Sequence, residues 1–112
     1  MEKVLIVNDC RLERKVMEDQ LLNLGYDARS TDEYGCLQQL DDYCPDIVIA
    51  NLTMNETTGD KLIAIIKGKR PQMKCFISSC SAIKLEDYTA QNVDAVFQTP
   101  VNLVELEQVL ND

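Results

Sequence analysis

Short apolar runs alternate with amphipathic stretches along the chain. The most apolar runs lie at residues 3–7, 46–50 and 75–78, and weaker ones lie at 27–30 and 94–98. The first three are too uniformly apolar for strands with one face in water, and this is typical of central strands in a parallel sheet. The pattern therefore predicts five strands, three of them buried on both faces.

The stretches between and after these runs predict five helices. They cover residues 11–24, a segment that opens at 30–33, about 58–67, about 82–92, and a final segment from 102. Gly25 is expected to stop the first helix, and the third is expected to end before Gly68. Ser30 and Glu33 have capping-box spacing for the second, and Asn102 is a good N-cap for the last.

The buried face of each helix is predicted from apolar residues that recur at helical spacing. The segment at 82–92 gives no clean stripe. The predicted buried residues are Leu12, Val16, Met17, Leu21 and Leu24, then Leu37, Leu40 and Cys44, then Leu62, Ile65 and Ile66, and finally Leu103, Leu106 and Leu110.

Strict alternation of strand and helix with short connections predicts an α/β fold. The expected architecture is a three-layer doubly wound (βα)5 sandwich with a five-stranded parallel sheet, built as one domain over residues 1–112. In such a fold the site lies where the strands end. The polar residues at those ends, which we expect to converge, are Asn8, Asp9, Asn51, Ser78, Ser79, Gln98 and Thr99.

Charge and missing motifs narrow the chemistry. The net charge is -8 and there is no histidine, so direct nucleic-acid binding and histidine-dependent nucleophilic catalysis are disfavoured. No membrane-length apolar run or signal peptide occurs, and a cytoplasmic protein is expected. The turn after the first strand lacks the glycines that cradle phosphates in nucleotide-binding folds. A carboxylate-lined cation and phosphoryl site is the remaining option for this fold.

Cysteine number and spacing favour reduced thiols in a cytosolic interior. The five cysteines form no C-x-x-C motif, and without histidine a structural zinc site is improbable. An alternative is a redox sensor that uses Cys10, or Cys75 with Cys80. It requires an exposed thiol of low pKa.

Several motifs together resemble the receiver domain of two-component response regulators. "KVLIVND" at the first strand, "LGYDARST" at the second, "PDIVIAN" at the third, Gly59 in the following loop and "TP" at 99–100 are similar to the family's pattern over nearly the whole chain. The resemblance implies the chemotaxis-regulator-like fold, and usually a cis proline at Pro100. It also implies an Mg²⁺-dependent phosphoryl site.

The chain departs from that pattern at the positions that the family uses for chemistry. The acidic pair is Asn8–Asp9, the phosphoacceptor position is Asn51, and the lysine position is Thr99. The switch hydroxyl is kept as Ser79 or, with a shift of one residue, Ser78. A proline common in the loop is replaced by Asn55, and the aromatic residue of the fifth strand by Val96.

These departures predict a pseudo-receiver without enzymatic activity. Clustered carboxylates repel one another and need a cation, and with two of three lost, Asp9 alone is a weak candidate metal ligand. The vestigial pocket comprises Asn8, Asp9, Asn51, Ser79, Thr99 and Pro100, and no cofactor is expected. Signalling would then depend on contact with a protein such as a histidine kinase or an output protein, or with a second copy.

Two surfaces are candidates for that contact, both from the resemblance. One surrounds the fourth helix, fifth strand and fifth helix and includes Lys84, Tyr88, Val96, Gln98 and Glu105. The other is the start of the first helix, near Cys10, Arg11 and Arg14.

Plainer or different roles stay open for the pocket residues. Asn51 could bond its own loop, Asp9 could be the N-cap of the first helix, and Ser79 and Thr99 could be ordinary loop hydroxyls. A rival function is an active receiver that accepts phosphate on another carboxylate, with Asp9 the best placed.

Overall fold

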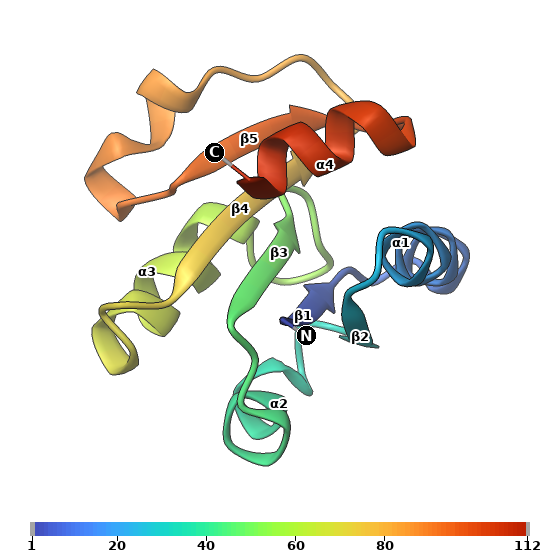
Figure 1. Ribbon diagram of the computed structural model, residues 1–112. Helices are drawn as coiled ribbons and strands as arrows, with labels where there is room; N and C mark the ends of the chain where they lie inside the picture. The colour runs from blue at the N-terminus through green and yellow to red at the C-terminus, as the bar shows by residue number, and fades with distance from the viewer. Residues whose placement is uncertain (1, 112) are drawn as a thin grey trace.

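Five parallel strands form the centre of the molecule. The computed structural model describes residues 2–111. In the sheet the order is β2–β1–β3–β4–β5, and every neighbouring pair is parallel (Figure 1). The strands are β1 (Lys3–Val7), β2 (Asp27–Thr31), β3 (Ile47–Asn51), β4 (Lys74–Ser79) and β5 (Ala95–Gln98). This doubly wound order confirms the predicted fold class, and places the topological switch between β1 and β3.

Helices cover both faces of the sheet and complete three layers. In Figure 1, α1 and α4 lie on one face, and α2 and α3 lie on the other. Two buried clusters correspond to these faces, one between the sheet and α1 with α4, the other between the sheet and α2 with α3. The helices are α1 (Arg11–Asn23), α2 (Cys36–Tyr43), α3 (Gly59–Lys69) and α4 (Leu103–Asn111), with a 3-10 helix η1 at Leu85–Gln91.

The central strands are buried on both faces, as their composition predicts. Val4, Leu5, Val48 and Ile49 have no exposed surface. β-branched side chains suit such strands, because their restricted rotamers pack well on a pleated surface. Gly25, at φ +92°, ends α1 in the left-handed region as expected.

The predicted buried face of α1 is wrong in its first half. Met17 and Leu21 are buried, but the side chains of Leu12 and Val16 are 72% and 51% exposed. Only the second half of the helix packs on the sheet. The first half borders a cavity instead, as described below.

α2 begins later than predicted and buries a different face. β2 continues through Thr31, so Ser30 is a strand residue whose hydroxyl donates to Glu18, and the predicted capping box does not form. The helix starts at Cys36. Its buried residues are Cys36, Leu40 and Tyr43, whereas Leu37 and Cys44 are exposed.

Smaller corrections apply to the remaining helices. α3 continues through Gly68 to Lys69, and it buries Ile63 where Ile65 was predicted. In α4, Leu103 is 41% exposed. The predicted cap is confirmed, since the Asn102 side-chain oxygen accepts the Glu105 N–H at 2.8 Å.

The segment between β4 and β5 and the outer edge of the sheet complete the fold. η1 is broken at Tyr88, where φ is -124° and ψ is 16°. At the β2 edge, the Arg29 guanidinium lies 4.4 Å from the centre of the Tyr43 ring.

No helix within residues 2–111 has the length and apolar character needed to cross a bilayer.

Candidate functional site

Polar residues lie at the carboxyl ends of the strands. After β1 these are Asn8 and Asp9, and Asn8 is the more buried of the two. Its backbone N–H donates to the Thr31 carbonyl at 3.0 Å. Its side-chain oxygen accepts the Cys10 N–H at 2.9 Å, and its carbonyl accepts from Arg14 at 2.7 Å. Asn8 therefore fixes the turn into α1 from both its backbone and its amide.

Asn51 ends β3 and bonds chiefly to its own loop. Its side-chain N–H donates to the Thr53 carbonyl at 2.8 Å, and its side-chain oxygen accepts a long hydrogen bond of 3.4 Å from the Ser78 hydroxyl. Asn51 and Ser78 are register partners of β3 and β4. The plainer alternative of a strand-terminal amide bonded to its loop describes these contacts.

Both carboxylate oxygens of Asp9 accept hydrogen bonds from backbone N–H groups, which come from two different loops. One oxygen accepts the Glu33 N–H at 3.3 Å, and the other accepts a short hydrogen bond from the Asn55 N–H. The N-cap residue of α1 is Cys10, which makes no side-chain cap. Asp9 is therefore not the predicted helix cap but a link between the loops after β2 and β3.

Glu33 makes the same kind of link, and sequence reasoning missed it. Its side chain is only 9% exposed. Its two carboxylate oxygens accept the N–H groups of Glu56 and Thr57 at 2.9 and 3.0 Å. Bonds of an ionised carboxylate to N–H donors are among the stronger hydrogen bonds in proteins. The one sequence signal for Glu33, its spacing from Ser30, suggested a local cap instead.

The loop between β3 and α3 closes tightly on the end of β3. Thr53 and Thr58 form an isolated antiparallel bridge, and the Gly59 N–H donates to the Leu52 carbonyl at 2.9 Å. A Cβ atom on Gly59 would lie 2.6 Å from the Asn51 carbonyl oxygen. Only glycine fits this close approach of α3 to the strand.

These residues do not fit the divalent cation that the receiver resemblance implies. Mg²⁺ needs several oxygen ligands in octahedral geometry. Within residues 2–111, no group of three acidic, cysteine or histidine side chains is arranged to hold a metal ion. Both oxygens of Asp9 already accept N–H groups, which leaves this weak candidate ligand poorly placed for a metal.

The remaining pocket residues divide between two places. The Ser79 hydroxyl accepts the Ser81 N–H at 3.0 Å, which is an ordinary loop role. The Thr99 N–H donates to the Ser79 carbonyl at 2.7 Å, and the Thr99–Pro100 peptide is cis, as the resemblance implies. Thr99 and Pro100 line a cavity with Asn8 and with Ser78, whereas Asp9, Asn51 and Ser79 are not among its lining residues.

The surface around η1, β5 and α4 presents the predicted contact residues unequally. Lys84, Gln98 and Glu105 are exposed, and Gln98 donates to the Cys80 carbonyl at 3.3 Å. Tyr88 and Val96 are half-buried and pack against the core on the α3 face. We call these five residues the η1–β5–α4 surface. At the start of α1, Cys10 and Arg11 are exposed, and Arg14 is half-buried.

The cysteines correct one prediction and weaken another. Cys36 and Cys75 are buried, but Cys10, Cys44 and Cys80 are exposed, and all five are free. Burial raises the pKa of the Cys36 and Cys75 thiols to about 12, which disfavours the ionised thiolate form that reacts. Cys75 lies within β4 and Cys80 directly after it. A strand rises about 3.3 Å per residue, so the extended backbone between them keeps them too far apart for a disulfide.

Comparison with solved structures identifies the fold as that of response-regulator receiver domains. The chemotaxis response regulator CheY4 of Vibrio cholerae matches with a TM-score of 0.89 at 19% identity, over 99% of this chain and 97% of that one. A receiver domain protein from Clostridium thermocellum gives 0.88 at 19% identity, over 99% and 92%. A LuxR-family DNA-binding response regulator from Staphylococcus aureus gives 0.82 at 22%, over 99% and 97%. By sequence, no protein-family model and no characterised protein matches the chain.

Proposed function

We infer that this chain is an atypical receiver domain of two-component or phosphorelay-type signalling, which acts by protein contact and without phosphorylation. The observation that carries the proposal is the state of Asn51. It stands where the resemblance places the phosphoacceptor, and both ends of its amide are bonded, to Thr53 and to Ser78. An amide at this position is a poor nucleophile for a phosphoryl group.

The surroundings of Asn51 support the same proposal. Thr99 carries no charge with which to stabilise a transferred phosphoryl group. The rival proposal, phosphoryl transfer to Asp9, requires a carboxylate that is available to a donor. Both oxygens of Asp9 instead accept backbone N–H groups, from Glu33 and Asn55.

The proposed partner is a protein of a signalling pathway, such as a histidine kinase, an output protein or a second copy of this chain. The η1–β5–α4 surface is the first candidate for the contact, because Lys84, Gln98 and Glu105 are exposed there. The start of α1 is the second candidate. An acidic chain, with a net charge of -8, favours a partner with a basic surface.

A phosphorylation assay tests the proposal. The folded chain is incubated with acetyl phosphate and Mg²⁺, and the intact mass is measured. We expect no phosphoryl adduct, and no change in the NMR spectrum when beryllium fluoride and Mg²⁺ are added as a phosphoryl mimic. A stoichiometric adduct on any carboxylate would overturn the proposal.

A repaired variant is the matched control for that assay. Asn8→Asp, Asn51→Asp and Thr99→Lys together restore the carboxylates and the cation that the resemblance implies. We expect Mg²⁺ binding by this triple variant in calorimetry. If the triple variant responds under the same conditions, the absence of a response in the natural chain is due to its residues and not to the assay conditions.

A further inference from the structure

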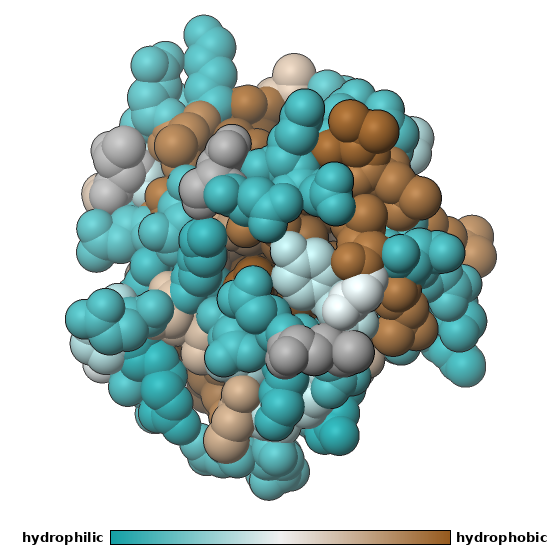
Figure 2. Space-filling model, in the orientation of Figure 1, coloured by the Kyte–Doolittle hydropathy of each residue, from teal (hydrophilic) through white to brown (hydrophobic). Residues whose placement is uncertain are grey.

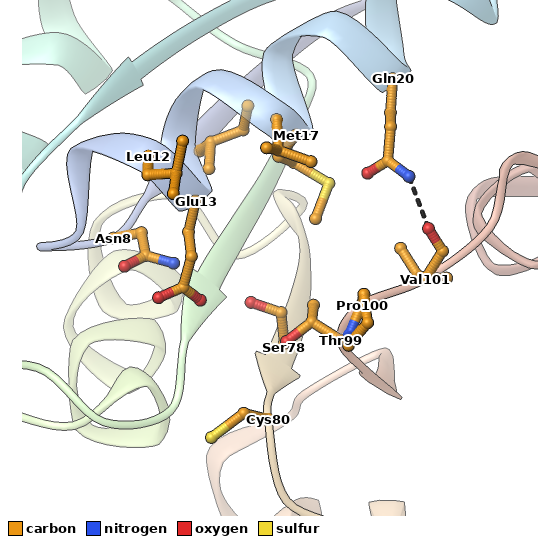
Figure 3. Close-up of a pocket in the computed structure, with 12 residues that line it drawn as sticks. Asn8, Leu12, Glu13, Met17, Gln20, Ser78, Cys80, Thr99, Pro100 and Val101 are labelled. Carbon is orange, nitrogen blue, oxygen red and sulfur yellow. Dashed lines mark hydrogen bonds between the residues drawn. The ribbon is translucent and has the colours of Figure 1, made fainter.

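A cavity of about 360 Å³ opens between the first half of α1 and the ends of β4 and β5. Figure 3 shows it from the side, with α1 above and the Thr99–Val101 segment on the right. Its volume falls in the range of small-molecule sites, which run from roughly 300 to 1,000 Å³. The lining residues are Ile6, Asn8, Leu12, Glu13, Val16, Met17, Gln20, Ser78, Cys80, Thr99, Pro100 and Val101.

One wall of the cavity is apolar and partly open to water. Leu12 and Val16 are 72% and 51% exposed, and Met17 lies deeper, at 6%. On the side of the molecule where α1 and α4 lie, apolar side chains gather at the surface (Figure 2). Removing such surface from water is favourable, so the wall suits a ligand with an apolar body.

The opposite end of the cavity is polar and carries one kind of charge. Asn8, Ser78 and Thr99 contribute amide and hydroxyl groups there. Figure 3 shows the Glu13 carboxylate reaching from α1 toward this end, on the side of Asn8 and Ser78. Among the lining residues of the described chain, Glu13 is the one that bears a charge. The polar end therefore offers a carboxylate and several hydrogen-bond acceptors.

Basic residues near the start of α1 do not reverse this preference. Arg11, Arg14 and Lys15 are not among the residues that line the cavity. Arg14 is engaged with the Asn8 carbonyl at 2.7 Å, and Lys15 pairs with Asp19 at 3.3 Å. The whole chain also has a net charge of -8. Both the local and the overall charge thus favour a cationic ligand.

We propose that this cavity binds a small organic cation with an apolar body, of the class of protonated alkyl- or arylamines. The ammonium group pairs with Glu13 and donates hydrogen bonds to the hydroxyl oxygens of Ser78 or Thr99. The apolar body covers Leu12 and Val16. Because the Ser78 hydroxyl also donates to the Asn51 side chain, a ligand bonded to Ser78 is connected through this one side chain to the end of β3. The proposal is independent of whether the chain is phosphorylated.

Three probes of equal length test the charge preference. Hexylamine, 1-hexanol and hexanoate carry the same apolar chain with a positive, neutral or negative end. Binding is measured from the NMR methyl shifts of Leu12, Val16 and Val101 at pH 7 and low salt. Ligands of this size reach a Kd on the order of a millimolar. We expect hexylamine to bind about five-fold more tightly than hexanol, the gain from a partly exposed ion pair, and hexanoate to bind most weakly.

Variants then assign the contacts. Glu13→Gln should bring hexylamine to the affinity of hexanol. The matched control Glu107→Gln makes the same charge change on the exposed surface of α4, outside the cavity, and should keep the preference. Leu12→Asn should weaken all three probes, and its high exposure leaves folding intact.

Three results would each overturn the proposal. The first is the absence of methyl shifts with every probe at saturating concentration. The second is binding of hexanoate equal to or tighter than that of hexylamine. The third is an unchanged preference in Glu13→Gln.

Discussion

At the carboxyl ends of the strands, the polar groups of two neighbouring regions are arranged in opposite ways. After β1, β2 and β3, Asp9 and Glu33 bind four backbone N–H groups, and the loops close on one another. Between α1, β4 and β5, Ser78 and Thr99 face an open cavity. We call these the closed half and the open half. Carboxylate–backbone hydrogen bonds thus hold one side of this edge closed, while the other side opens into a cavity.

In the closed half, two carboxylates are bonded to backbone N–H groups of neighbouring loops. Hydrogen bonds from backbone N–H groups to an ionised carboxylate are among the stronger hydrogen bonds in proteins. Asp9 accepts the N–H groups of Glu33 and Asn55, and Glu33 accepts those of Glu56 and Thr57, so each carboxylate is bonded to residues far away in the sequence. These hydrogen bonds therefore tie together the loops after β1, β2 and β3.

The largest expected effect comes from filling the space at Gly59, in the closed half. Gly59→Val should lower the free energy of unfolding by about 3 kcal/mol, because its Cβ would lie 2.6 Å from the Asn51 carbonyl oxygen. Urea denaturation measures the change. The control is Gly68→Ala, an exposed position in α3 where an added Cβ would have no atom within 4 Å apart from those of its own helix backbone and chain neighbours. It should raise stability by about 0.5–1 kcal/mol. Equal effects at both glycines would show that the approach of α3 to β3 is not tight.

A smaller loss is expected when the closed half loses one carboxylate. Glu33→Ala leaves the Glu56 and Thr57 N–H groups without acceptors, which should cost about 2 kcal/mol. Amide hydrogen exchange at both residues should speed up. Glu33→Gln keeps one side-chain oxygen and should lose less. If exchange at Glu56 and Thr57 is unchanged in Glu33→Ala, the two loops are held together by other contacts.

The smallest effect is expected in the open half. Thr99→Val should change the free energy of unfolding by less than about 0.5 kcal/mol, because no hydrogen bond of the Thr99 hydroxyl is found within residues 2–111. Thermal unfolding monitored by circular dichroism measures this. A loss of more than about 1 kcal/mol would mean that the open half is as tightly matched as the closed half.

The strands and the position of the site were predictable because the apolar runs that form the strands are local features of the sequence. Runs such as residues 46–50 are apolar enough to require burial on both faces. Alternation with helices then allows few topologies. The polar ends of β1, β3 and β4 follow directly from where those runs stop.

The helix faces and the loop contacts were not predictable, for a physical reason. Periodicity shows that Leu12 and Val16 share a face with Met17, but not that the sheet covers only part of that face. Glu33 illustrates the same limit, since its partners Glu56 and Thr57 lie more than twenty residues away. Such contacts depend on how loops meet in space. The capping box that the Ser30–Glu33 spacing predicts does not form, because both side chains bond to residues elsewhere in the chain.

The outer edge of the sheet has a consequence for self-association. β2 has one free edge, and unpaired N–H and C=O groups on an edge strand invite pairing with another chain. Its sequence places Asp27 and Arg29 there, and the Arg29 guanidinium rests over the Tyr43 ring. A second copy that added its strand at this edge would meet these charged side chains. Charged side chains on an edge strand disfavour the addition of a further strand, so this side of the molecule is a poor place for sheet extension.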